Sequence, residues 1–116
     1  MATKKQFEAF CKECNRYIDI FGITEYFVNY QHDKIDNDEW QAGCTVDIEG
    51  MNAIIILSNN ISMTNYEVRA AAKHEVLELL LGKLNLIMKS RTITAREIDT
   101  ERHTVINRLL RVKITK

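Results

Sequence analysis

One helical segment constrains the fold of this chain more than any other feature. Residues 66–84 form a helical run that is apolar almost all round, and a helix of that kind is largely buried. Three polar residues stand in its middle: His74, Glu75 and Glu78. A charged side chain that is buried alone costs several kcal/mol, so these residues need a cation, polar partners or a water-filled cleft.

The spacing of the three residues favours a metal. His74 and Glu78 are four residues apart and therefore lie on one face of the helix. Imidazole and carboxylate are both zinc ligands, and Glu75, about 100° round the helix, can reach a group held beside the metal. The segment matches the zinc-protease motif H-E-x-x-H except that Glu78 replaces the second His.

A hydrolytic zinc site needs a third protein ligand, and His103 in the last helix is the best candidate. Together with His74 and Glu78 it gives the usual set of two His and one Glu. Glu101 is a weaker alternative, and Asp99 is a candidate acceptor for the His103 ring N–H. Without a metal, the two glutamates would be solvated or paired with nearby Lys and Arg, and His74 would be a core histidine.

Local patterns predict a single domain over residues 1–116 with an α+β fold. Capping signals and hydrophobic periodicity place the helices, and alternating β-branched and aromatic residues place the strands. The first expected element is a helix over 4–21, closed by Gly22, and three strands follow over 25–32, 40–48 and 53–57. A second helix is expected over 66–84, where Gly82 interrupts or ends it, and a last helix from Thr94 to about Val112. A turn over 49–52 predicts an antiparallel hairpin, so we expect a small, mostly antiparallel three-stranded sheet covered by helices.

Composition limits the functions open to the chain. Sixteen basic and sixteen acidic residues cancel, which gives no support to nucleic-acid binding. Four basic residues lie near the C-terminus: Arg108, Arg111, Lys113 and Lys116. We expect them to solvate the end of a helix and not to bind nucleic acid. No apolar run approaches the ~20 residues that span a bilayer, and the N-terminal residues lack the apolar core of a signal peptide. We therefore expect a cytoplasmic protein without a membrane partner.

The three cysteines argue against a disulfide framework because their number is odd. Cys11 and Cys14 form a C-x-x-C pair, but both fit the apolar face of the first helix, where free Cys behaves as a small hydrophobe. A structural zinc site would need four ligands, and Cys44 and His32 could complete such a set only by coincidence of folding.

Two segments resemble a known family. Residues 72–81, AKHEVLELLL, followed by residues 97–109, EIDTERHTVINRL, are similar to small phage-encoded proteins assigned as zinc metallopeptidases. The similarity covers the C-terminal half well and the N-terminal half only as a general strand pattern. It implies a minimal zincin-like fold, with His74, Glu78 and His103 as ligands and Glu75 as general base. Glu78 departs from the standard zincin pattern.

These observations lead to the hypothesis of a metallopeptidase that uses one Zn²⁺ ion and acts on a peptide or protein substrate, in the host cytoplasm if the chain is phage-encoded. Glu75 would move the proton, and a substrate peptide could pair with a free sheet edge such as residues 53–58. The alternative is a non-catalytic phage protein, with a structural metal or none, that acts as a protein-interaction module. Glu75 separates the two hypotheses, because a structural metal site does not need it.

Overall fold

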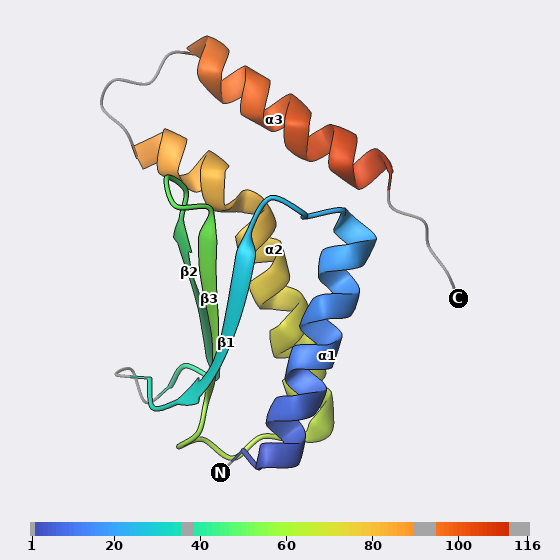
Figure 1. Ribbon diagram of the computed structural model, residues 1–116, viewed down its shortest axis with the longest axis vertical. Coiled ribbons are helices and arrows are strands. Elements are labelled where there is room, and N and C mark those ends of the chain that lie inside the picture. The colour runs from blue at the N-terminus through green and yellow to red at the C-terminus, as the bar shows by residue number, and fades with distance from the viewer. Residues whose placement is uncertain (1, 36–38, 90–94, 112–116) are drawn as a thin grey trace.

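The computed structural model describes residues 2–35, 39–89 and 95–111, which contain three helices and a small mixed sheet (Figure 1). This layout confirms the predicted α+β class. The elements in chain order are α1 (Lys4–Phe21), β1 (Phe27–Asp33), β2 (Ala42–Asp47), β3 (Asn52–Ser58), α2 (Asn65–Lys89) and α3 (Ala95–Leu110). Thr94 and Val112, the predicted limits of the last helix, lie outside the described residues.

Helix α1 begins and ends where its capping residues predict. The Thr3 hydroxyl accepts a hydrogen bond from the Gln6 amide (3.1 Å), and the Gln6 side chain accepts one from the Thr3 amide (3.0 Å). Gly22 closes the helix in the left-handed conformation (φ 66°), which glycine adopts without steric cost. The Gln6 side chain also donates to the Met63 carbonyl (2.8 Å), so it joins the start of α1 to the segment that precedes α2.

The sheet has the order β1-β3-β2, with β3 in the centre. β2 and β3 form the predicted antiparallel hairpin, in which Cys44 lies opposite Ile55. β1 pairs with β3 in parallel, so one of the two strand pairs is antiparallel. The suggestion that residues 53–58 form a free edge is wrong, because β3 is bonded on both sides; β1 and β2 are the edges.

Helices α1 and α2 cover one face of the sheet (Figure 1). Alternate residues of β3 therefore differ in burial: Ile55 and Leu57 are fully buried, whereas Ile54 and Ile56 are only partly covered. The fully buried side chains come mainly from α1, β3 and α2, while β1 and β2 contribute partly buried ones; the largest buried side chains are Phe10, Ile23, Ile55, Leu57, Leu79, Val68 and Val76.

Gly82 does not end the helix that contains it, because α2 continues to Lys89. Its role is to allow close packing. A Cβ atom at position 82 would stand 3.2 Å from Cγ2 of Val46, nearer than most such contacts. A side chain at position 82 would therefore require the Val46 side chain to move away from the helix.

Helix α3 crosses the end of the molecule where α2 finishes (Figure 1). Val105 and Glu101 are the buried residues of this helix, whereas Leu109 is 46% exposed. Arg108 pairs with Glu25, which precedes β1, and this ion pair helps to fix which face of α3 turns inward.

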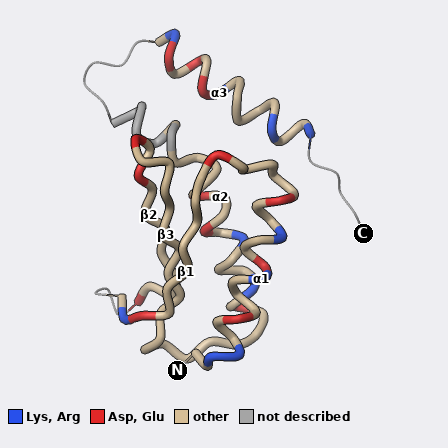
Figure 2. Tube along the Cα trace, in the orientation of Figure 1, with Lys and Arg blue, Asp and Glu red and all other residues tan. Residues whose placement is uncertain are grey.

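Charges of both signs are spread along the chain in Figure 2, and the basic residues do not gather on one face. Of the basic group near the C-terminus, Arg108 is engaged with Glu25, and Lys113 and Lys116 lie outside the described residues. In the described part of the chain, no helix combines the length and the apolar character that crossing a membrane requires.

Candidate functional site

A cleft of about 650 Å³ lies between β2 and α2, and the central residues of the motif line it. One wall is the segment that leads into β2 together with the first residues of that strand, and the other wall is the middle of α2. The lining residues are Glu39, Trp40, Gln41, Ala42, Gly43, Cys44, Ala70, Ala71, His74, Glu75 and Glu78.

The two walls are held together at both ends of the cleft. Thr64 and Glu67 form a capping box at the start of α2. The same Glu67 carboxylate accepts a hydrogen bond from the Gln41 side chain (2.8 Å), which ties the start of β2 to the first turn of the helix. At the far end, Val46 packs on Gly82. β2 therefore runs alongside α2 in the same direction, past the motif.

His74 and Glu78 lie on one face of α2, as their spacing predicts. Imidazole Nε2 of His74 stands 3.6 Å from carboxylate Oε1 of Glu78. Their side chains are 68% and 47% exposed, respectively. Both groups are therefore solvated at the mouth of the cleft. The helix is buried on one face only, and Arg69, Ala70 and Lys73 are exposed together with His74 and Glu78, so the expectation of a helix buried almost all round is wrong.

Glu75 is the desolvated member of the motif. It is 6% exposed, and it makes no hydrogen bond or close ion pair with any described residue. Burial raises the pKa of its carboxyl group, nearby His74 lowers it, and the charge of Glu78 raises it again. Its carboxylate oxygens are not among the described polar atoms that are buried without a partner, so they open on the cleft. Carboxyl groups with a perturbed pKa in a cleft are concentrated at functional sites.

Cys44 and Trp40 are cleft residues that reasoning from the motif missed. The Cys44 thiol faces the motif: burial, followed by the charges of Glu75 and Glu78, raises its pKa to about 12. The alternation of residues 40–48 did place both side chains on one face of a strand. To predict that this face of the strand lies against α2, one must know the order of the strands in the sheet. No local sequence pattern contains that information.

Cys11 and Cys14 have the structural character that their helix face predicts. Cys14 is fully buried and Cys11 partly so, and all three cysteines of the chain are free thiols. Burial raises the pKa of both thiols of the pair. A redox pair would instead need at least one thiol with a lowered pKa.

The raised thiol pKa values predict a loss of stability in alkali. The folded protein holds Cys14 and Cys44 as neutral thiols well above the pKa of 9.0 that applies to an unfolded chain. Their contribution to stability is therefore complete below about pH 8 and is lost as the pH rises beyond 9, by up to about 1.4 kcal/mol per pH unit for each fully buried thiol. The effect of Cys44 is smaller, because it is partly exposed.

Urea denaturation between pH 7 and pH 9.5 measures this loss. We expect the free energy of unfolding to fall more steeply in the wild type than in Cys44→Ala. Equal slopes for the two proteins would contradict the assignment of Cys44 as a neutral, desolvated thiol.

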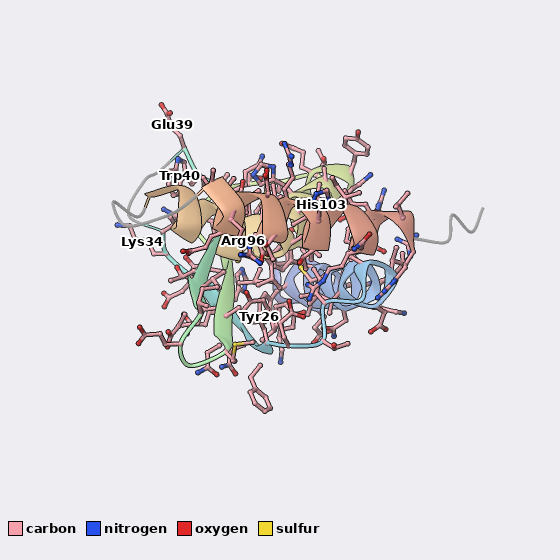
Figure 3. The ribbon with its side chains drawn as sticks, turned by 90° about the horizontal axis from the view of Figure 1, so that it is seen from above. Tyr26, Lys34, Glu39, Trp40, Arg96 and His103 are labelled. Carbon is pink, nitrogen blue, oxygen red and sulfur yellow. The ribbon has the colours of Figure 1, made fainter. Side chains whose placement is uncertain are left out.

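The remaining candidate ligands lie elsewhere. His103 is exposed on α3 and does not line the cleft, and Figure 3 places it on that helix. Glu101 points into a second cleft of about 270 Å³, which Glu25 and Arg108 also line. His32 stacks on Phe7, with ring centroids 4.9 Å apart. Within residues 2–35, 39–89 and 95–111, no three His, Cys, Asp or Glu side chains are grouped closely enough to hold a metal.

The structure therefore brings His74, Glu75 and Glu78 together in one cleft and leaves His103 apart from them. Comparison of the chain with protein-family models, with curated proteins and with solved structures gave no match.

Proposed function

We propose that the protein is a zinc-dependent metallopeptidase whose site is the cleft between β2 and α2. The separation of His74 Nε2 and Glu78 Oε1, 3.6 Å, carries the proposal. Two ligands of a tetrahedral zinc ion with bonds of about 2.0–2.1 Å lie about 3.3 Å apart. The two side chains thus stand close to the spacing that one ion requires, at an exposed position that an ion can reach.

The position and burial of Glu75 favour a catalytic metal site over a purely structural one. The residue is largely buried and lines the cleft beside the two proposed ligands, and its carboxylate oxygens open on the cleft. A raised pKa brings a carboxylate closer to the working range of a general base. A structural metal site gains nothing from such a group, because it lowers the stability of the fold and binds no ligand.

The chain supplies a place for the substrate backbone along β2. This strand forms one edge of the sheet, and its first residues line the cleft. An extended peptide that pairs with β2 would pass directly in front of His74 and Glu75. The edge at β2 replaces the central strand β3 that the sequence suggested. A bound zinc ion would polarise the peptide carbonyl and acidify a water. Glu75 would take a proton from that water as its oxygen attacks the carbonyl carbon, and would deliver the proton to the amine that leaves when the C–N bond breaks.

Metal content measured by mass spectrometry tests the zinc site. We expect one zinc per wild-type chain after purification without added metal and dialysis. His74→Ala and Glu78→Ala should each lower zinc affinity by more than the ~100-fold that loss of an outer-shell partner can cause. Arg69→Ala, an exposed change on the same helix, should retain the metal. Absence of zinc from wild-type protein under every loading condition would overturn the proposal.

His103→Ala identifies the third ligand. We keep His103 as the predicted one, which requires α3 to lie closer to the cleft in the zinc-loaded protein than it does here. Loss of zinc in this variant would assign His103 to the ligand set. Retention of zinc would assign the third position to a group in the cleft, where Cys44, Glu39 and Glu75 carry donor atoms, and the zinc content of Cys44→Ser would then show whether the thiol is that ligand.

A further inference from the structure

The cleft has two parts of different chemistry. Its polar part holds His74, Glu75 and Glu78. The part toward the start of α2 is lined by small apolar side chains facing one large one. Ala70 and Ala71 form the helix wall, Ala42 belongs to the strand wall, and Trp40 stands at the rim.

Trp40 is 56% exposed, which is unusual for so large an apolar side chain. It precedes β2 at the edge of the molecule (Figure 3). Exposed indole surface becomes favourable when a ligand covers it, at about 25 cal/mol for each Å² of apolar area removed from water. Ala70 and Ala71 on the helix wall have side chains of a single methyl group, which leaves room in the cleft beside the indole ring.

This apolar part lies next to the proposed reaction centre. Ala70 and His74 are separated by four residues and therefore stack one above the other on the same face of α2, about 5–6 Å apart. Side chains on one face of an extended peptide recur about every 7 Å. A peptide carbonyl near His74 thus places a neighbouring side chain of the same peptide beside Ala70 and Trp40.

We propose that the space between Trp40 and Ala70–Ala71 is a specificity subsite for a large apolar side chain, aromatic or branched aliphatic, next to the bond that is cleaved. This inference rests on the proposed peptidase function and assigns its substrate class: peptides with such a residue beside the scissile bond. The helix wall presents only methyl groups to the indole. Glu39 also lines the cleft, so basic side chains are tested beside the apolar ones.

Trp40 is the only tryptophan in the chain, so its fluorescence reports directly on the subsite. The probes are blocked hexapeptides of Ala and Ser that carry one Phe, Leu, Lys or Ala at each position in turn. Titration is performed on zinc-loaded Glu75→Gln protein, which should bind without cleaving. We expect Phe and Leu peptides to shift the Trp40 emission and to bind at least about tenfold more tightly than the Ala peptide.

A matched pair of variants assigns the preference to Trp40. Trp40→Ala should abolish the preference for Phe over Ala, as measured by anisotropy of dye-labelled peptides. Phe27→Ala removes another strongly exposed aromatic side chain, on β1, and should leave the preference intact. Circular dichroism checks that both variants are folded.

The outcomes separate this inference from the proposed function. Selective binding of Phe peptides without any hydrolysis by the wild type would sustain the subsite and contradict the peptidase. Hydrolysis by the wild type with equal efficiency on Phe and Ala peptides would contradict the subsite alone. Tighter binding of Lys peptides, or no detectable peptide binding, would also overturn the subsite.

Discussion

Replacement of Glu75 by Gln is expected to lower peptidase activity by about 10²–10⁴-fold while zinc remains bound. The size of the loss is that of a general base removed from a reaction. Gln has nearly the same shape as Glu, so the cleft should keep its form. Activity is measured on Phe-containing peptides, and zinc content by mass spectrometry. Glu8→Gln, an exposed change on α1, serves as the control and should retain full activity.

The same substitution should stabilise the metal-free protein. The folded protein raises the pKa of Glu75 above the value of 4.5 that an unfolded chain has, chiefly by burial. A carboxyl group of this kind favours folding at pH values below 4.5 and loses that contribution as the pH rises through its folded pKa. At pH 7 the wild type therefore bears the cost of a buried carboxylate, and Glu75→Gln should be about 1 kcal/mol more stable.

Urea denaturation at pH 7 and at pH 4 measures this difference in unfolding free energy. The stability advantage of the Gln variant should shrink as the pH falls, because the wild-type carboxyl becomes neutral as well. A variant that is both less active and less stable at pH 7 would indicate that Glu75 has a structural function, contrary to our proposal.

The second large effect is expected at Ile55 in the central strand. Its side chain is fully buried between the sheet and the two covering helices. Ile55→Ala should lower the free energy of unfolding by about 3–4 kcal/mol, because it removes apolar contacts and leaves a cavity. For a domain of this size that loss is a large part of the total stability.

Ile54 provides the matched control, because it is adjacent in sequence and points to the opposite, uncovered face of the sheet. Ile54→Ala should cost about 1 kcal/mol. Thermal or urea denaturation of the two variants compares the two faces directly. Equal losses would mean that something also covers the second face in solution.

Local sequence predicts the elements of this fold well, because their signals are local. The Thr3 and Thr64 capping boxes and Gly22 mark helix ends, and they act within one helical turn. The sheet order is a different matter. Pairing β1 with β3 in parallel joins strands that are separated by the whole of β2, and no single strand carries a signal for it.

In the candidate site, too, some features follow from local sequence and others depend on the tertiary arrangement. The relation between His74 and Glu78 follows from helix geometry and could be predicted. The positions of Cys44 and Trp40 depend on which edge β2 occupies. The position of α3 involves contacts between residues far apart in sequence, such as the ion pair of Arg108 with Glu25, and in this position His103 does not line the cleft.

The contact between Gly82 and Val46 has a consequence for how the cleft is shaped. At that end the Val46 side chain of β2 packs directly on the bare backbone of α2 at Gly82. At the other end a hydrogen bond between the Gln41 and Glu67 side chains joins the two elements. The cleft walls are therefore fixed to each other on both sides of His74 and Glu75, so the distance between the walls is set by contacts that lie outside the motif itself.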